Sequence, residues 1–430
     1  MSATGGVEAI DRIASARRDM PLVTGLPATY QAPGPLSGRV IAACVHLTPE
    51  TVVLVEALRG LGARLRLCAA NPLSTQEGVA DYLDRLPGVD VVLGGADWDG
   101  YRWAVEEVAA QGADLVIDDG ADLILATGAS ADHASRTLLG ACENTSTGAL
   151  RLEAAQDAGR LDVPVFAITR SAAKRLYDDL HGTGQSVLDA LLRTTNLLLA
   201  GRVAVVAGYG TCGRGIASRL RAVGARVVIT EISPQAALEA SLDGLSVAPM
   251  LEAIKDADLV VTATGSRDVV TERHLREAKS GVILANAGHF DVEIDTEWLR
   301  KTGPGTPVRA GLMSYSLPSG KDVLLAAEGR VVNLAAAEGH PPAVMDVTFV
   351  TVALCLLEWS SAQSPTVTGQ PRHPYAAGVH AVPAHIDTTV ARLALEQAGV
   401  QLDVPTRAQH EYLRTWGGPV RTGSDPYPAE

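Results

Sequence analysis

The sequence predicts an α/β protein whose strands lie in parallel sheets, and three observations support this. Seven short apolar runs, rich in β-branched residues, recur along the chain at 39–44, 114–117, 163–168, 202–207, 226–229, 259–262 and 282–286. Amphipathic stretches of helical length separate them, which is typical of strand–helix–strand units. The runs are continuous rather than alternating, as expected for strands buried on both faces of a parallel sheet.

The composition limits the class of protein. The chain has 430 residues, 47% hydrophobic and 20% charged, which indicates a globular protein of two or three domains. The net charge is −13 without a basic stripe, so we expect no nucleic-acid partner. No run of 18 or more apolar residues and no secretory leader occurs, so we expect no membrane partner. The five scattered cysteines form no CxxC pair, which favours a reducing cytoplasm and no metal site.

The strongest local motif follows the run at 202–207. Gly208, Gly210 and Gly213 form a GxGxxG pattern between this predicted strand and a helix-like stretch. In such a turn the glycines permit a tight bend, close approach of a pyrophosphate and close helix–strand packing. Glu231 ends the next predicted strand, where a carboxylate accepts from the ribose hydroxyls of NAD. The pattern predicts NAD binding; the alternative is a glycine-rich turn without a ligand.

Polar residues follow several predicted strands, at the edge where α/β proteins bind ligands. They are His46, Thr48, Asp118, Asp119 and the segment 143–147. Elsewhere, Lys174 and Asp178 have the i, i+4 spacing of a helix pair, which a solvated ion pair would explain equally well. From the residues alone, the sequence predicts an NAD-binding enzyme of unknown substrate.

Nine segments, read in order, resemble S-adenosylhomocysteine hydrolase. They are CVHLTPET, DDGADL, ENTSTGALRL, KRLYDDLHGTGQS, VAVVAGYGTCGRG, ITEISPQAALEA, NAGHFDVEID, EGRVVNLAAAEGHPPAVM and GVHAVP, and the resemblance runs from about residue 28 to 427. It implies two Rossmann-like, doubly wound parallel-sheet domains plus a short C-terminal tail. We expect the substrate-binding domain at 1–183 and 343–390, the NAD-binding domain at 184–342, and the tail or oligomerisation segment at 391–430.

The resemblance also implies a cytosolic homotetramer that holds NAD tightly and exchanges its C-terminal tail between subunits. Its expected substrate is an adenine nucleoside. The family oxidises the 3′-hydroxyl with NAD, removes the C4′ proton, eliminates the 5′ substituent, adds water and re-reduces the ketone. In this scheme the protein supplies positions and protonation states while the cofactor supplies the redox chemistry.

The site residues implied by the resemblance form three groups. The catalytic residues are Lys174 and Asp178 at the ribose hydroxyls, with His46, Asp119 and His289 around C4′ and the leaving group. The substrate contacts are Thr48, Glu50, Thr51 and Thr145, with Glu50 accepting from the adenine amino group, and His340 and Met345 at the purine. The cofactor contacts are Gly208, Gly210, Thr211, Cys212, Gly213, Glu231, Asn333, and, in the tail, Arg421 and Tyr427.

Two positions of the implied catalytic cluster depart from the family pattern. Asn144 stands where the family has a second glutamate, and Asp179 where it has asparagine; Glu338 also replaces an uncharged residue. Moving a carboxylate within a desolvated pocket changes which group holds a proton.

We therefore favour a diverged member that expels water from the 5′-type carbon and leaves an exocyclic alkene, as in nucleoside antibiotics of the angustmycin type. One alternative is S-adenosylhomocysteine hydrolysis, with the changes at Asn144 and Asp179 compensating each other. The other is a non-catalytic NAD-binding regulator.

Overall fold

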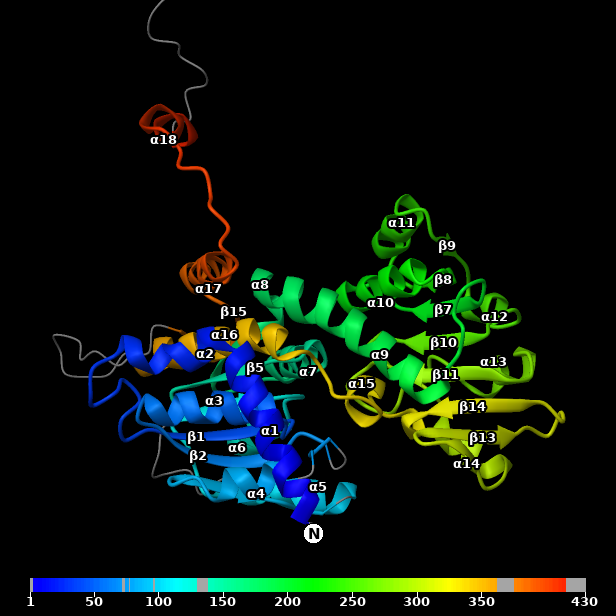
Figure 1. Ribbon diagram of the computed structural model, residues 1–430, viewed down its shortest axis with the longest axis horizontal. Coiled ribbons are helices and arrows are strands. Elements are labelled where there is room, and N and C mark those ends of the chain that lie inside the picture. The colour runs from blue at the N-terminus through cyan, green and yellow to red at the C-terminus, as the bar shows by residue number, and fades with distance from the viewer. Residues whose placement is uncertain are drawn as a thin grey trace, which may run out of the picture.

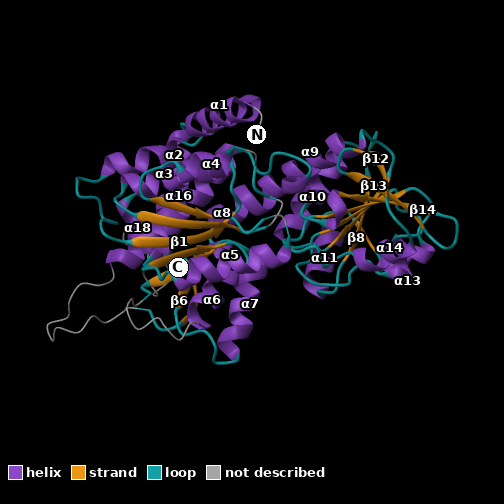
Figure 2. Ribbon diagram, turned by 90° about the horizontal axis from the view of Figure 1, so that it is seen from below, coloured by secondary structure: helices purple, strands orange, loops and turns teal. Residues whose placement is uncertain are grey.

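The computed structural model describes residues 3–71, 74–76, 78–95, 97–129, 138–361 and 375–414. It has two lobes, each built on one mainly parallel sheet with helices on both faces (Figures 1 and 2). This confirms the predicted fold class of two Rossmann-like domains. All seven apolar runs form strands, each within one residue of its predicted bounds.

The sheet of the first lobe is doubly wound. Its seven parallel strands have the order β15-β6-β5-β4-β1-β2-β3. Their bounds are β1 (Val40–Val45), β2 (Arg64–Ala69), β3 (Val89–Val92), β4 (Leu115–Asp118), β5 (Gly140–Glu143), β6 (Pro164–Ala167) and β15 (Gly378–Ala381). The chain runs from β1 to β2 and β3 on one side and then crosses to β4 on the other. The switch point between β1 and β4 is where α/β proteins bind ligands.

Two apolar helical layers cover this sheet. One layer contains α1 (Ala3–Asp19), α2 (Pro21–Gly25), η1 (Leu26–Thr29), α3 (Pro49–Gly60), α4 (Val79–Asp84), α16 (Pro342–Ser361) and α17 (Ala384–Gln397). The other contains α5 (Trp98–Ala110), α6 (Asp122–Ala129) and α7 (Ser146–Asp157). Both faces are therefore buried, which explains the continuous apolar strands.

Helix α16 is, within the described ranges, the one helix long and apolar enough to cross a membrane. Of its most apolar window, 67% is buried inside the protein. Trp359 near its end stacks on Phe166 of β6, with ring centroids 3.9 Å apart. These contacts identify α16 as a core helix of the first lobe.

The second lobe is also doubly wound, with the strand order β12-β13-β14-β11-β10-β7-β8-β9. The bounds are β7 (Val203–Ala207), β8 (Arg226–Thr230), β9 (Ser246–Val247), β10 (Leu259–Thr262), β11 (Val282–Asn286), β12 (Thr306–Arg309), β13 (Leu312–Ser316) and β14 (Asp322–Ala326). Strand β13 is antiparallel to β12 and β14. The helices are α10 (Thr211–Ala222), α11 (Pro234–Leu242), α12 (Met250–Ala253), α13 (Glu272–Glu277), α14 (Thr296–Thr302) and η5 (Ala327–Gly329). Its switch point lies between β7 and β10.

Two crossings join the lobes. After β6, the chain passes through η3 (Ile168–Arg170), α8 (Ala172–Lys174), the π-helix η4 (Arg175–Gly182) and α9 (Thr183–Thr195). It returns through α15 (Val332–Ala335) to α16, and β15 then pairs with β6 at the edge of the first sheet. The first lobe is therefore discontinuous in sequence. The domain boundaries that we placed at 183/184 and 342/343 stay predictions.

The C-terminal segment leaves the body of the protein after α17. It runs extended to α18 (Arg407–Leu413), away from both lobes (Figure 1). All residues from 396 to 414 are exposed. The predicted tail contacts Arg421 and Tyr427 lie outside the described residues.

Candidate active site

A cavity of about 360 Å³ lies between the two lobes, a size typical of small-molecule sites. The loops that follow β1, β4 and β5 form one wall, and the turn after β7 and the loop after β11 form another. The π-helix η4 and the start of α16 close it. Both switch points therefore open onto the same space.

This cavity collects most of the predicted site residues. All predicted catalytic and substrate-binding residues line it: His46, Thr48, Glu50, Thr51, Asp119, Asn144, Thr145, Lys174, Asp178, Asp179, His289, His340 and Met345. Of the predicted cofactor contacts, Gly210, Thr211, Cys212 and Asn333 also line it. Gly208, Gly213 and Glu231 lie at the turn after β7 and just beyond β8, outside the lining.

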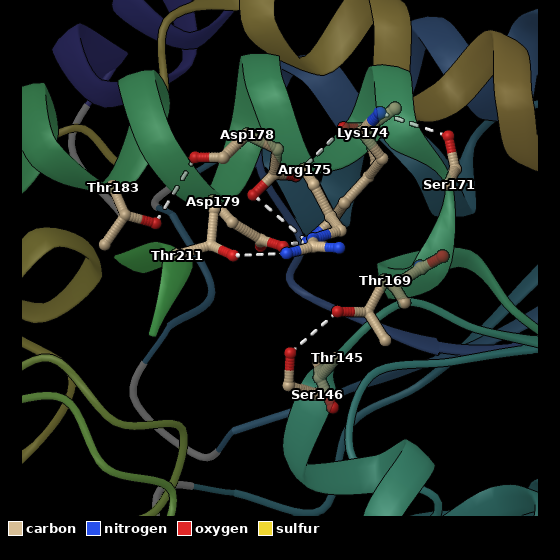
Figure 3. A network of polar contacts seen from close by, with 12 residues as sticks. Thr145, Ser146, Thr169, Ser171, Lys174, Arg175, Asp178, Asp179, Thr183 and Thr211 are labelled. Atoms are coloured by element: carbon tan, nitrogen blue, oxygen red, sulfur yellow. Dashed lines mark hydrogen bonds and ion pairs between the residues drawn. The ribbon is translucent and has the colours of Figure 1, made fainter. Parts of the chain in front are cut away.

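Lys174 holds two carboxylates rather than one. Ser171 caps the helical run because its Oγ accepts from the backbone N–H of Lys174 at 3.1 Å. The Nζ of Lys174 contacts Asp179 directly and lies 3.4 Å from Asp178 Oδ1 (Figure 3). In an α-helix residue i+4 faces residue i. The wider turn of the π-helix η4 also brings residue i+5 to the lysine.

These three charges are buried, so the solvated ion pair that the spacing alone would allow is wrong. The Lys174 side chain is 6% exposed and that of Asp179 9%. Burial disfavours the Lys174 cation, but Asp178 and Asp179 outweigh it and raise its pKa. Burial also opposes the charge of Asp178, yet Lys174 and other donors prevail and lower its pKa. For Asp179 burial prevails and raises the pKa, so Asp179 is the more easily protonated carboxyl.

Asp178 is fixed from three directions. Besides Lys174, the Thr348 hydroxyl of α16 donates to its Oδ2 at 2.9 Å. His340 Nδ1 lies 3.4 Å from its Oδ1. Neither contact is apparent from the sequence near Asp178, because both partners come from the segment that returns to the first lobe. These contacts hold Asp178 as an anion beneath the lysine.

A second cluster surrounds the loops after β1 and β4. The rings of His46 and His289 lie 5.9 Å apart. Their burial in the cavity wall lowers the pKa of each to about 4, so both imidazoles are neutral at neutral pH and able to accept a proton. Ser74 Oγ lies 2.7 Å from His46 Nδ1. No motif marks Ser74, and sequence reasoning missed it.

Asp119 and Asn144 form a direct pair within this cluster. The Asn144 Nδ2 donates to Asp119 Oδ1 at 2.8 Å, and the backbone N–H of His46 donates to Asp119 Oδ2 at 3.3 Å. Burial raises the pKa of Asp119, although the Asn144 bond opposes the shift. Because an amide donates at every pH, Asn144 keeps this bond where an ionised glutamate could not. The Asn144 Oδ1 is buried without a partner among the described residues.

The turn after β7 has the shape that a dinucleotide requires. Gly208 has φ +93, and a Cβ at Gly213 would lie 2.0 Å from the Gly208 carbonyl oxygen. A Cβ at Gly210 would meet nothing within 4 Å, so open space faces the N-terminus of α10. The Glu231 carboxylate is held beside the turn by the backbone N–H groups of Tyr209, Ile232 and Ser233.

Asn333 adds a second sign of a cofactor. Its Nδ2 donates to Ser186 Oγ at 3.0 Å, while its Oδ1 is buried with no partner in the described part of the chain. A buried acceptor of this kind needs a donor, and the carboxamide of a nicotinamide is one. Together with the glycine turn, these residues fit NAD.

The purine-binding residues predicted from the resemblance lie at the start of α3 and on the returning segment before and within α16. Glu50 is in the first turn of α3 and is buried. Burial raises its pKa. Thr48, Thr51, His340 and Met345 also line the cavity. Their contacts with a base stay predictions.

Comparisons with known proteins identify the family. The chain matches the model for S-adenosyl-L-homocysteine hydrolase over residues 7–137 and the model for its NAD binding domain over residues 179–339. It is 44% identical to an adenosylhomocysteinase of Aeropyrum pernix, over 93% of this chain and 94% of the relative. An S-inosyl-L-homocysteine hydrolase of Methanopyrus kandleri is 42% identical, with 94% of each chain covered. An adenosylhomocysteinase of Thermotoga maritima is 42% identical over 93% of this chain and 97% of the relative. The chain therefore belongs to the S-adenosyl-L-homocysteine hydrolase family, and its cofactor is NAD.

Proposed function

We propose that the protein oxidises the 3′-hydroxyl of an adenine nucleoside, removes the C4′ proton, expels the 5′-type hydroxyl as water and re-reduces the ketone. The product is a nucleoside with an exocyclic alkene of the angustmycin type. The observation that carries this choice of leaving group is the charge of the cavity.

Carboxyl groups dominate the charged residues of the lining. Glu50, Asp119, Asp178, Asp179 and Glu338 all face the cavity, and the one lysine or arginine among the described lining residues is Lys174. Its charge is already matched by two carboxylates. A homocysteine group would bring an ammonium, which these carboxyl groups could receive, but also a carboxylate, for which the described lining offers no second lysine or arginine, and such burial is costly. A neutral sugar with a hydroxyl leaving group avoids this cost.

The first step falls to the lysine cluster. Lys174, once neutral, accepts the 3′-hydroxyl proton, while Asp178 holds the lysine in place. The glycine turn after β7, Glu231 and Asn333 would hold NAD, which would supply a reversible acceptor for the hydride of the 3′ carbon. The resulting ketone acidifies the neighbouring C4′ proton.

The elimination falls to the histidine cluster. One neutral imidazole of the His46–His289 pair takes the C4′ proton, and the protonated form of Asp119 donates a proton to the departing hydroxyl. The C4′–H and C5′–O bonds break, the C4′–C5′ double bond forms, and one water leaves. Asn144 neutralises no charge here, but it keeps Asp119 oriented.

S-adenosylhomocysteine hydrolysis is the second candidate, and the names of the 44%-identical and other relatives favour it. Substrate assays separate the two. Incubating the holoenzyme with S-adenosylhomocysteine, or with adenine nucleosides bearing a 5′-type hydroxyl, should give little homocysteine but a product lighter by one water. Rapid release of homocysteine without dehydration would refute the proposed leaving group.

The double variant Asn144→Glu with Asp179→Asn sharpens this test. It returns the carboxylate to the position that the resemblance implies for the family. Hydrolysis should rise in the double variant by more than the product of the two single effects, because neighbouring active-site groups are non-additive. Additive or falling hydrolysis would count against a role for these two positions in choosing the reaction.

We also propose that the protein is a cytoplasmic homotetramer whose C-terminal tail reaches a neighbouring subunit. The exposed segment supports this, because Val404 is 88% and Leu413 76% exposed although both are apolar. Removing residues 399–430 should reduce the number of subunits in the assembly and lower the amount of NAD that stays bound during purification. An unchanged tetramer would refute the tail's role in assembly.

A further inference from the structure

Two carboxyl groups lie directly behind the catalytic loops and have no role in the proposed chemistry. Asp118 is the last residue of β4 and Glu143 the last residue of β5, and the two face each other in the parallel register. Both are 0% exposed. The residues two positions earlier, Val116 and Ala141, share one apolar cluster. Because side chains alternate along a strand, Asp118 and Glu143 project from this same face of the sheet.

Each carboxyl has one occupied and one unoccupied oxygen. Asp118 Oδ2 accepts from the backbone N–H of Ile124 at 2.8 Å. Glu143 Oε1 accepts three bonds, from Gly120 N at 3.0 Å, from Thr145 N at 2.8 Å and from Thr145 Oγ1 at 2.7 Å. Asp118 Oδ1 and Glu143 Oε2 are buried with no partner in the described part of the chain. Two such oxygens are satisfied together if a single proton lies between them.

We propose that Asp118 and Glu143 share one proton at neutral pH, as a carboxylic acid bonded to a carboxylate, and that this dyad positions the catalytic loops. Through Gly120 N and Thr145 N, Glu143 holds the residues that directly follow Asp119 and Asn144. The dyad is thus a positioning device and makes no contact with substrate. It operates whichever leaving group the enzyme uses.

The surrounding charges agree with a single negative charge on the dyad. Burial, followed by the charge of Glu143, raises the pKa of Asp118. Burial also raises the pKa of Glu143 to about 8. The titratable and charged groups that face the dyad from the neighbouring elements are Cys44, Tyr101, Asp119, Asp122, Arg151 and His289. Arg151 is engaged by Asp122 and by the Gly120 carbonyl oxygen, so it does not neutralise the dyad.

A double-mutant cycle on the holoenzyme tests the shared proton. In Glu143→Gln the three donors at Oε1 force the amide nitrogen into the unoccupied position, where it donates to Asp118. In Asp118→Asn the Ile124 N–H does the same, so the new amide donates to Glu143. Each single variant should therefore change the unfolding equilibrium in urea by less than about tenfold. In the double variant two N–H donors face each other. Its ratio of folded to unfolded protein should therefore fall at least about tenfold below the value that the product of the two single effects gives.

The control substitution is Glu293→Gln in the second lobe. Glu293 is also buried, but both of its oxygens accept bonds from Thr264, and Oε1 also accepts from Gly265 N at 2.8 Å. Glu293 has no unoccupied oxygen, so the amide nitrogen of a glutamine at this position must face an N–H group that itself donates. This variant should be destabilised by itself, unlike Glu143→Gln.

Infrared spectroscopy of the unmodified holoenzyme supplies a second readout. A buried carboxylic acid C=O band should be present at neutral pH, vanish on titration through about pH 8, and be missing in Glu143→Gln and in Asp118→Asn. A dyad that is fully ionised at neutral pH would show no such band, and the two substitutions would combine additively. Either result would overturn the proposal.

Discussion

Asp179→Asn should accelerate the first oxidation, because Asp179 is one of the two carboxylates that hold Lys174 in its charged form. The substitution keeps the size of the side chain and removes its charge. Asp178 remains 3.4 Å from the Lys174 Nζ, so the lysine keeps a partner. Only an unprotonated amine can accept the 3′-hydroxyl proton.

The structure sets the size of the effect. A hydrogen bond to a charged group contributes about 1.5–3 kcal/mol, and each pKa unit corresponds to about 1.4 kcal/mol. Loss of the Asp179 bond therefore lowers the pKa of Lys174 by about 1–2 units. The unprotonated fraction at a given pH then rises about 10–100-fold, which is an upper bound for the rate because a less basic amine also takes a proton less readily.

Rapid mixing of holoenzyme with nucleoside, followed by the absorbance of reduced nicotinamide, measures this step across pH. Asp189→Asn is the matched control: Asp189 lies further along the same helical run and pairs with Arg193 at 3.0 Å on the surface. It should change the rate by less than about twofold, as exposed pairs contribute little. A slower first oxidation in Asp179→Asn, with an unchanged pH profile, would refute the assigned role of Asp179.

Three further variants test the cofactor turn, the histidine cluster and the packing of the first lobe. Gly210→Ala should fold with an unchanged apoprotein melting temperature but lose bound NAD, since its Cβ meets no protein atom within 4 Å; NAD content after denaturation measures this. Burial lowers the pKa of His46 to about 4, so the folded protein favours the neutral imidazole and loses stability as the pH falls from about 6.5 to 4. Urea titrations at these two pH values should show that His46→Gln reduces this loss of unfolding free energy by about 1–3 kcal/mol. Asp346 accepts hydrogen bonds from the backbone N–H groups of Leu22 and Val23 at 3.0 and 2.8 Å. Asp346→Ala should therefore lower the free energy of unfolding in urea by about 2–4 kcal/mol. An unchanged urea midpoint would contradict the contact.

The positions of seven strands and the location of the site could be predicted from the sequence because both depend on local patterns. Continuous β-branched runs mark strands buried on two faces, and polar residues just after them mark the carboxyl edge of the sheet. Eight strands were not among the predicted runs: β2, β3, β5, β9, β12, β13, β14 and β15. The antiparallel strand β13 is one example, because its residues, LMSYS, carry neither a continuous apolar run nor strict alternation. The family resemblance supplied the grouping of distant residues that patterns alone left open.

Contacts between distant segments could not be predicted. The π-helix that brings Asp179 to Lys174 packs against α9, α10 and α16, and a π-helix is rare enough that the local sequence does not predict it. Thr348 and His340 reach Asp178 only through the return of the chain to the first lobe. Ser74 lies beside His46 in a segment without a motif.

The central claim is that this member of the family eliminates a hydroxyl rather than a thiol. The most direct test follows an adenine nucleoside with a 5′-type hydroxyl by NMR while the unmodified holoenzyme turns it over in deuterated water. We predict deuterium exchange at C4′ of the remaining substrate and growth of exocyclic alkene signals, with poor hydrolysis of S-adenosylhomocysteine. Absence of the alkene, together with S-adenosylhomocysteine hydrolysis at a kcat/KM of about 10⁴ M⁻¹s⁻¹ or above, would contradict the account.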